Sequence, residues 1–288
     1  MEEILKLKKE DWSENILEMN DAPEQLYYIG MKPNWDSVFL TVVGSRKYSQ
    51  YGKEVCEKLI AGLKGYDITI VSGLALGIDA IAHNSALENR LNTMAVPGSG
   101  LDRKVLYPKS NLPLAEKILK SGGTLLSEYE PNQGAAPWTF PQRNRIMAGL
   151  AKATLVIEAT EKSGTLITAR LALDYNRELC AVPNSVFSLY SKGSNRLLNE
   201  GATPINSSQD LLQVLGFDLL DTSQQLEMRF NDCSKEEKLI LENIREPKTR
   251  DELIQELNLP TSQINILLSS MEIKGLISQS LGKIRVRG

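Results

Sequence analysis

The chain has 288 residues, of which 42% are hydrophobic and 24% are charged, and its net charge at pH 7 is −3. This composition is ordinary for a soluble globular protein: it excludes extensive disorder and leaves room for one large domain and a small module. No apolar run approaches the roughly 20 residues that span a bilayer, which excludes a membrane-spanning helix.

Residues 1–36 predict a short helical or irregular lead, in which Tyr27-Tyr28-Ile29-Gly30 is a possible edge strand. The first 30 residues hold three lysines against eight carboxylates, so this lead is acidic. Its first residues, Met1-Glu2-Glu3, lack the basic and apolar regions of a signal peptide. We therefore expect a cytoplasmic protein that does not associate with a membrane.

From residue 37 to residue 217, apolar runs of strand length alternate with segments of helical length. Such alternation predicts an α/β fold, built from βαβ units around a mostly parallel sheet with helices on both faces. The predicted strands are 38–43, 67–71, 92–96, 124–127, 153–158 and 179–182, and the predicted helices include 50–64, 77–88, 111–121 and 164–175.

The first of these strands ends in a polar turn, Gly44-Ser45-Arg46, and a predicted helix follows. Free backbone N–H groups and the dipole at a helix start attract anions, and a guanidinium can bind a phosphate through two hydrogen bonds. We therefore interpret Gly44, Ser45 and Arg46 as a phosphate-facing turn. The alternatives are a plain turn with a solvated arginine, or an ion pair between Arg46 and Asp79. The glycine spacing matches neither a dinucleotide fingerprint nor a Walker A loop.

Further glycine-rich or polar loops, among them residues 140–145, follow the other predicted strands. Because the carboxyl ends of parallel strands meet at one edge of a sheet, these segments should line one crevice together with the turn at Arg46. Their cations would make it a basic, glycine-lined groove. The predicted groove residues are Gly44, Ser45, Arg46, Ser72, Gly73, Gly98, Ser99, Gly100, Lys109, Phe140, Arg143, Asn144, Arg145, Ser163, Gly164 and Thr165.

Three of the groove residues have a structural interpretation as well. Arg143 and Arg145 either touch a ligand or pair with Glu128 or Glu158 inside the fold. Phe140 either stacks on a base or belongs to the core. The sequence leaves these alternatives open.

The other reactive residues do not assemble into a catalytic or metal-binding constellation. His83 is the only histidine, and its place four residues after Asp79 on a predicted helix is more often structural than catalytic. Cys56, Cys180 and Cys233 are isolated, which predicts free thiols and no zinc. We expect no catalytic residue, no metal and no cofactor.

The pattern changes after Asn206. Ser208 is the expected N-cap of a short helix, and the polar, irregular residues 218–233 predict a linker. Residues 234–288 predict helices at 235–245, 250–257 and 261–274 and a hairpin at 276–287 with Gly282 at its turn. This arrangement is typical of a winged helix, which reads a DNA groove in some proteins and docks on other proteins in others.

Several motifs follow one another in unbroken order from about Tyr27 to Leu212. They are Gly44-Ser45-Arg46, Ser72-Gly73-Leu74-Ala75-x-Gly77-Ile78-Asp79 with His83, Tyr107-Pro108, Ser127-Glu128-Tyr129, Phe140-Pro141-x-Arg143-Asn144-Arg145 and Ser163-Gly164-Thr165-x-Ile167-Thr168-Ala169. Together they resemble the DNA-processing protein A (DprA/Smf) family. One departure is Val182-Pro183-Asn184, where the family usually has Pro-Gly, and the N-terminal helical domain of some members is missing or reduced here.

The resemblance implies an extended Rossmann-like domain that binds single-stranded DNA, with the groove residues as its DNA contacts. It also implies a homodimer that protects incoming single-stranded DNA and helps to load RecA recombinase during natural transformation of competent cells. Many members carry a C-terminal winged helix. The alternative is a nucleotide-processing enzyme, because similar domains occur in phosphoribohydrolases. Their Pro-Gly-Gly-x-Gly-Thr loop is absent, so we expect a binding protein and no enzyme.

Overall fold

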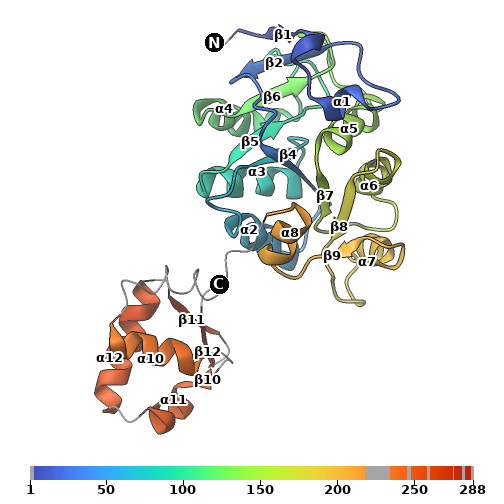
Figure 1. Cartoon of the computed structure of the whole chain (residues 1–288). Coiled ribbons are helices and arrows are strands. Elements are labelled where there is room, and N and C mark those ends of the chain that lie inside the picture. Colours follow the sequence, from blue (N-terminus) through green and yellow to red (C-terminus); the bar gives the residue numbers. More distant parts are fainter. Residues whose placement is uncertain are drawn as a thin grey trace. The chain divides into compact units, whose positions relative to one another are not determined.

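A computed structural model of the chain describes residues 3–217, 234–244, 248–257, 260–274, 276–280 and 283–286. The chain divides into two compact units, Met1–Asp218 and Leu219–Gly288 (Figure 1). The linker predicted at 218–233 lies outside the described residues. Within the described ranges, no helix combines the length and the apolar character needed to cross a membrane.

The first unit is built on a nine-stranded sheet (Figure 1). Its strands are β1 (Leu5–Leu7), β2 (Leu26–Gly30), β3 (Val38–Val43), β4 (Ile68–Ser72), β5 (Asn92–Ala95), β6 (Thr124–Ser127), β7 (Ala153–Val156), β8 (Glu178–Ala181) and β9 (Thr203–Pro204). They lie in the order β1-β2-β6-β5-β4-β3-β7-β8-β9. In this spatial order, every neighbouring pair in the run β6-β5-β4-β3-β7-β8-β9 is parallel. By contrast, β2 is antiparallel to β6, and β1 is antiparallel to β2. The predicted mostly parallel α/β sheet is confirmed.

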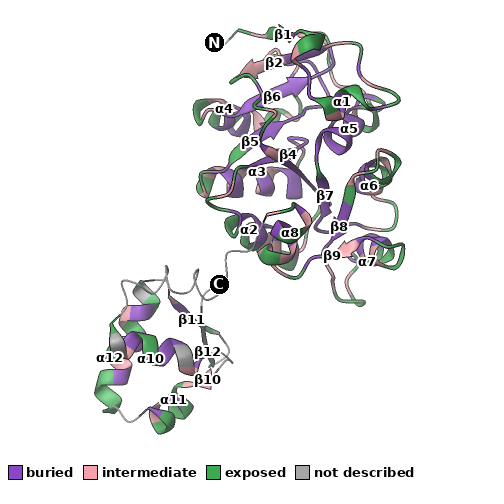
Figure 2. Ribbon diagram, in the orientation of Figure 1, coloured by how far each residue is buried: buried purple, intermediate pink, exposed green. Residues whose placement is uncertain are grey.

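Helices cover both faces of this sheet because its central strands are apolar on both sides. The helices are α1 (Glu14–Leu17), α2 (Gln50–Ala61), α3 (Ile78–Glu88), α4 (Leu112–Lys120), α5 (Thr139–Leu150), α6 (Thr165–Asp174), α7 (Lys192–Asn199) and α8 (Ser208–Val214). Val42 packs in a buried cluster with α2, α3 and α8, whereas the next residue, Val43, packs in another with α1, α5 and α6. Figure 2 shows the buried strands between these two helical layers.

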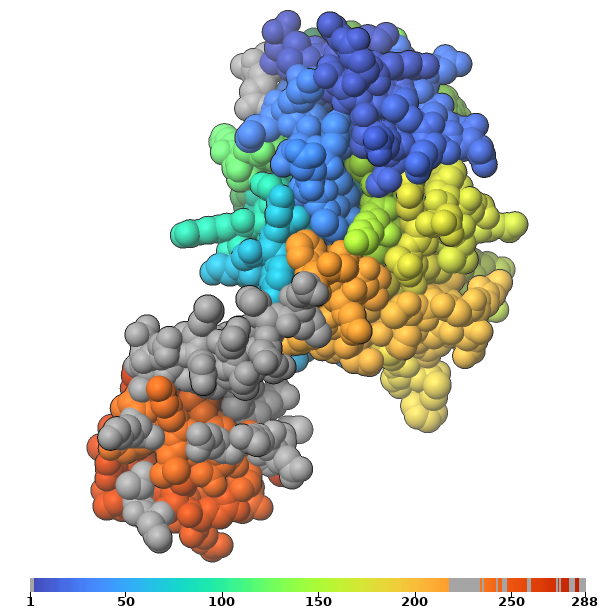
Figure 3. Space-filling model, in the orientation of Figure 1, coloured from blue at the N-terminus to red at the C-terminus, as the bar shows by residue number. Residues whose placement is uncertain are grey.

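The N-terminal lead is part of the sheet. Tyr27 of β2 lies opposite Ser127 of β6, so the strand predicted at residues 27–30 is present. It is not the edge of the sheet, because β1 pairs with its other side. Trp12, Ile16 and Leu26 are buried in the same cluster as Val43. The boundary expected at residue 36 therefore does not separate two compact parts, because the apolar side chains before it pack into the sheet unit. Figure 3 shows the N-terminal segment, in dark blue, covering one end of that unit.

Two local predictions are wrong. Residues 140–145, expected to form a loop, are part of the first turns of α5. Pro141 is tolerated there because the first backbone N–H groups of a helix have no partner within the helix. The N-cap of α8 is Ser207, which forms a capping box, whereas the Ser208 hydroxyl donates to the carbonyl of Leu59 at 3.1 Å.

The second unit contains three helices and a small antiparallel sheet in its described residues. The elements are α10 (Lys235–Asn243), β10 (Lys248–Thr249), α11 (Arg250–Glu256), α12 (Thr261–Ile273), β11 (Ile277–Ser280) and β12 (Lys283–Val286). Ile240, Leu253 and Ile264, one from each helix, meet in its core. The expected turn residue Gly282 lies outside the described residues, and the winged-helix interpretation stays a prediction.

Candidate nucleic-acid interface

The turn after β3 lies at the carboxyl edge of the parallel strands, between the segments that follow β4 and β7. The Ser45 N–H donates to the carbonyl of Glu158 at 2.9 Å, and the Ser45 carbonyl accepts from the Ile78 N–H at 3.3 Å. Gly77 has a φ of +82°, and a Cβ at this position would lie only 2.4 Å from the Ser45 oxygen. A glycine is therefore required where the two segments meet. The predicted convergence of these segments is present.

A carboxylate of the protein itself occupies the start of α2. Glu158, which is fully buried, accepts from the backbone N–H of Ser49 at 2.9 Å and from its hydroxyl at 2.5 Å. It also accepts from the side-chain amide of Asn184 at 3.0 Å. Because negative charge is favourable at a helix N-terminus, Glu158 already satisfies the helix start that was predicted to attract a phosphate. The charge that this turn offers to a ligand is that of Arg46.

A small pocket opens beside the turn. The Cζ of Arg46 lies 5.5 Å from the centroid of the Phe140 ring. The ring of Tyr107 lies 5.5 Å from that of Phe140, centroid to centroid, at an angle of 53°. Aromatic faces beside a guanidinium suit the base and the phosphate of a nucleotide. The pocket is lined by Arg46, Gly73, Ala75, Leu76, Tyr107, Pro108, Phe140 and Arg143.

Arg46 is exposed, and among the described residues no ion pair joins it to a carboxylate. The carboxylate of Asp79 is instead used by backbone N–H groups, those of Gly73 at 3.0 Å and Ala75 at 3.4 Å. Burial raises the pKa of Asp79, and the charge of Arg143 opposes that rise. The alternative of an Arg46–Asp79 ion pair has no contact to support it.

Arg143 forms part of the pocket floor and is only 4% exposed. Its guanidinium donates to the carbonyls of Gly73, at 2.6 Å, and Val96, which directly follow the neighbouring strands β4 and β5. Its Nε donates to the side chain of Asn144 at 3.2 Å. Burial lowers the pKa of Arg143 to about 10, so it stays charged at neutral pH. Arg143 therefore adds positive charge beneath the pocket while its donors bind the protein.

Four further predicted groove residues, Ser72, Gly98, Ser99 and Gly100, are not among those that line the pocket. The hydroxyls of Ser72 and Ser99 are fully buried and donate to backbone carbonyls, at 2.7 and 3.0 Å. A Cβ on Gly98 would lie 2.6 Å from Cδ1 of Phe140, and one on Gly100 would lie 2.2 Å from a backbone oxygen. Gly98 and Gly100 must lack a side chain because the Phe140 ring and the backbone of Glu130 approach them closely.

Lys109 stands exposed at the rim, directly after Pro108, which lines the pocket. The side-chain amide of Asn111 ties this segment to the pocket wall through the carbonyls of Leu74 and Ala75, at 2.9 and 3.0 Å. Lys109 forms no ion pair with any residue in the described ranges. Its ammonium group is thus available to a phosphate near the pocket.

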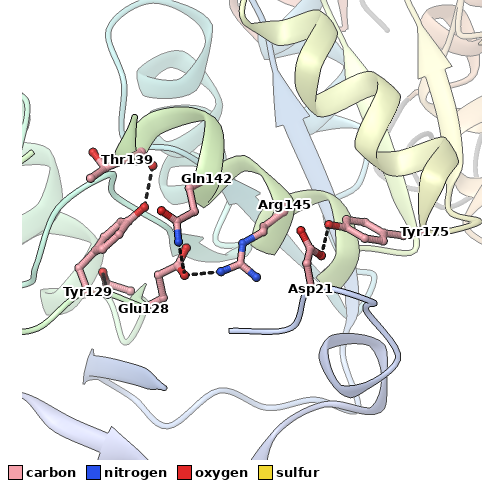
Figure 4. Close-up of polar contacts among 8 residues, drawn as sticks. Asp21, Glu128, Tyr129, Thr139, Gln142, Arg145 and Tyr175 are labelled. Carbon is pink, nitrogen blue, oxygen red and sulfur yellow. Dashed lines mark hydrogen bonds and ion pairs between the residues drawn. The ribbon is translucent and has the colours of Figure 1, made fainter. Parts of the chain in front are cut away.

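Arg145 lies on α5 but is not among the residues that line the pocket. It forms an ion pair with Glu128, which also accepts from Gln142 at 3.2 Å (Figure 4). The side chains of Arg145 and Glu128 are only 11% and 7% exposed. Burial raises the pKa of Glu128, and Arg145 opposes this rise. The structural interpretation of Arg145 is therefore the one that the contacts support.

Ser163, Gly164 and Thr165 lie at the start of α6, after β7. The Ser163 hydroxyl donates to that of Thr165 at 2.9 Å and accepts from the Thr165 N–H at 3.2 Å. These residues share the carboxyl edge with the pocket but do not line it. Conversely, Tyr107 and Leu76 line the pocket and were not among the predicted groove residues. The place of Tyr107 before Pro108, in the segment after β5, was the available signal.

The single histidine is buried and does not line the pocket. His83 is fully buried, its Nδ1 lies 2.7 Å from the Thr93 hydroxyl, and burial lowers its pKa to about 3. No contact joins it to Asp79 among the described residues. Cys56 and Cys180 are buried free thiols, and Cys233 lies outside the described ranges. Within those ranges, no cluster of His, Cys, Asp and Glu could hold a metal ion.

Comparison with known sequences finds a family profile that matches most of the first unit. The sequence profile of DNA recombination-mediator protein A matches residues 3–216. DNA processing protein DprA of Streptococcus pneumoniae is 42% identical over 203 residues, which are 70% of this chain and 71% of that protein. Protein Smf of Escherichia coli is 36% identical over 216 residues, which are 75% of this chain but 57% of that longer protein.

Solved structures agree with this result. The crystal structure of S. pneumoniae DprA is similar with a TM-score of 0.69 and 38% identity, covering 76% of this chain and 75% of that one. DNA processing protein A of Helicobacter pylori, described for its single-stranded DNA binding mode, is similar with a TM-score of 0.67 and 30% identity. That match covers 75% of this chain and 98% of the H. pylori chain.

Proposed function

Because the chain belongs to the DNA recombination-mediator protein A family, we propose that it binds single-stranded DNA at the pocket between Arg46, Tyr107 and Phe140. The observation that carries this proposal is the guanidinium of Arg46 over the ring of Phe140, at the carboxyl edge of a parallel sheet. Lys109 at the rim supplies a second cation. Arg143 supports the pocket from below.

The chemistry of the pocket favours binding that tolerates any sequence. Its exposed parts are aromatic or apolar faces and cations, whereas the hydroxyls of Ser72 and Ser99 are buried and already bonded. Aromatic rings stack on every base, and cations bind phosphates, which are the same in every nucleotide. A duplex offers no unstacked base to such a pocket. We therefore expect a preference for single strands.

We also propose that the protein is a recombination mediator and no enzyme. The buried, uncharged His83 cannot reach a ligand in the pocket, and the carboxylate of Asp79 is bonded to backbone N–H groups. Among the described residues, neither His83 nor Asp79 is therefore placed to act as a general base in the pocket. They argue against the alternative of a nucleotide-processing enzyme.

The cellular role that fits this binding is protection of incoming single strands and loading of RecA recombinase during natural transformation, with the protein acting as a homodimer. Family membership supports this role. It is tested by measuring RecA filament formation on DNA that is covered with a single-strand-binding protein, with and without this chain. Absence of any stimulation would overturn it.

The binding proposal itself is tested by titrating single-stranded and duplex oligonucleotides over a series of salt concentrations. We expect tighter binding of single strands and a linear fall of log affinity with log salt, because each bound phosphate releases a counterion. If the log affinity did not change with log salt, the protein would not bind DNA through phosphate contacts. Hydrolysis of nucleotides without strand binding, assayed in parallel, would favour the enzyme instead.

A further inference from the structure

The exposed aromatic side chains of the first unit all lie at one edge of its sheet. Among its described residues they are Tyr48, Tyr51, Tyr107, Trp138 and Phe187. Each lies between the carboxyl end of a strand and the first turn of the next helix, after β3, β5, β6 or β8. Exposed rings scattered at random would also occur on the other surfaces. Their restriction to this edge indicates a shared ligand.

The loop between β8 and α7 is the most exposed apolar part of this edge. Val186, Phe187 and Leu189 are 78%, 94% and 76% exposed. None of the three lines the pocket at Phe140. Apolar side chains exposed together mark an interaction site rather than a structural element. This loop is therefore not part of the DNA-binding pocket proposed above.

This loop is attached to the segment that carries Arg46. The Tyr51 hydroxyl of α2 donates to the Pro183 carbonyl at 2.8 Å, and the Asn184 amide binds Glu158, which holds the start of α2. Ser49, Tyr51 and residues 183–185 and 188 line a shallow hollow between the two segments. A surface therefore runs from the turn after β3 to the loop after β8.

The charge along this surface suits a nucleic acid better than a protein or a membrane interior. Lys47 beside Arg46 and Lys192 at the start of α7 are exposed, and neither forms an ion pair within the described residues. Among the described residues no carboxylate lines the hollow, and that of Glu158, which binds Ser49 beside it, is fully buried. Cations beside exposed rings are the combination that single-stranded nucleic acids select.

We infer that the loop at residues 183–191 is a second base-stacking site, with Phe187 as its ring, for the same DNA strand that enters the pocket at Phe140. This inference rests on the proposed function and adds a second part to the surface that contacts DNA. From β4 to β8 there are three strand spacings of about 4.8 Å, or about 14 Å, which is about four nucleotides at 3.4 Å each. At that stacked spacing a trinucleotide is too short to place a base at both sites, whereas a dodecanucleotide is long enough.

The test compares (dT)3 and (dT)12 on the full chain and on Phe187→Ala, using competition against a labelled strand. Loss of one stacked base should weaken (dT)12 binding about ten-fold or more and leave (dT)3 binding unchanged. Phe187→Tyr should bind like the unchanged protein, whereas Phe187→Leu, which is apolar but has no ring, should bind like Phe187→Ala. Leu17→Ala, an exposed apolar change on α1, is the matched control.

Three results would overturn the inference. Equal (dT)12 affinity of Phe187→Ala and the unchanged protein would show that no base stacks there. Full affinity of Phe187→Leu would exclude a requirement for the ring. A change of oligomeric state in Phe187→Ala, measured by sedimentation velocity, would assign the loop to contact between two copies of the chain. If the unchanged protein binds neither oligonucleotide, the proposed function fails as well.

Discussion

The guanidinium of Arg46 lies over the ring of Phe140, with its Cζ 5.5 Å from the ring centroid. Arg46 comes from the turn after β3 and Phe140 from the first turn of α5, so the two groups meet only in the folded sheet. Their contact joins a cation and a stacking surface in one unit. A nucleotide that stacks on the pocket rings therefore has a positive charge within reach of its phosphate.

Arg46→Ala should weaken binding of single-stranded DNA about ten- to a hundred-fold, because a charge-assisted contact to a phosphate is worth about 1.5–3 kcal/mol. Arg46→Lys should lose part of this affinity, since an ammonium cannot form the two-pronged contact. The melting temperature should change little, because Arg46 is exposed and has no ion pair within the described ranges. Affinity and melting temperature are measured on the same samples. An unstable variant that still binds normally would contradict the pocket.

Gly98→Ala should weaken DNA binding by displacing Phe140. The new Cβ would lie 2.6 Å from Cδ1 of that ring, a separation that real Cβ atoms do not show. We expect a loss of several-fold in affinity, with a smaller effect on stability because the ring can turn toward solvent. Gly134→Ala is the matched control, since an added Cβ there meets no atom within 4 Å. Equal affinities of the two variants would show that Phe140 is not held by this contact.

Arg145→Met should destabilise the protein by about 3–5 kcal/mol, because it leaves the carboxylate of Glu128 buried without its partner. The double variant Arg145→Met, Glu128→Gln should recover much of this loss. Both are compared by urea denaturation, and strand affinity per folded molecule should stay within a few-fold. Full stability with lost affinity would mean that Arg145 contacts DNA after all.

His83 should make stability fall in acid. Its pKa is about 3 in the folded protein and near 6.5 when unfolded, so the unfolded chain binds the proton first. Stability is then fully present above pH 6.5 and falls by about 1.4 kcal/mol per pH unit between about pH 6 and pH 3. A His83→Gln variant should lack this component when unfolding is measured from pH 7.5 to 5. Because the chain has one histidine, its ring signals in NMR spectra give an independent check. A titration near pH 6.5 in the folded protein would contradict the prediction.

The parts of the fold that the sequence predicted are those set by continuous apolar runs. The strand 38–43 coincides with β3 because Phe39 to Val43 are buried between two helical layers. The helix at Thr139–Leu150 was missed because Pro141 and two arginines conceal its apolar face in the sequence. β9, with two residues, is too short to leave a pattern.

The candidate site was predictable in its location but less so in its individual contacts. The parallel order of β4, β3 and β7 brings their carboxyl ends together, which follows from the βαβ pattern. Whether an arginine faces a ligand or a carboxylate depends on tertiary packing. Arg46 and Arg145 both stand in polar segments of the sequence, yet the first is exposed and the second is paired with Glu128.

The antiparallel addition of β2 to β6 has a practical consequence for any shortened version of the protein. A chain that started at residue 37 would leave the outer hydrogen-bonding groups of β6 open to a neighbouring molecule, and exposed strand edges promote aggregation. It would also uncover the apolar surface that Trp12, Ile16 and Leu26 now bury. Such a fragment would precipitate or pair edge to edge, although it would retain every residue of the proposed DNA pocket. Expression of an isolated DNA-binding unit must therefore keep the N-terminal strands.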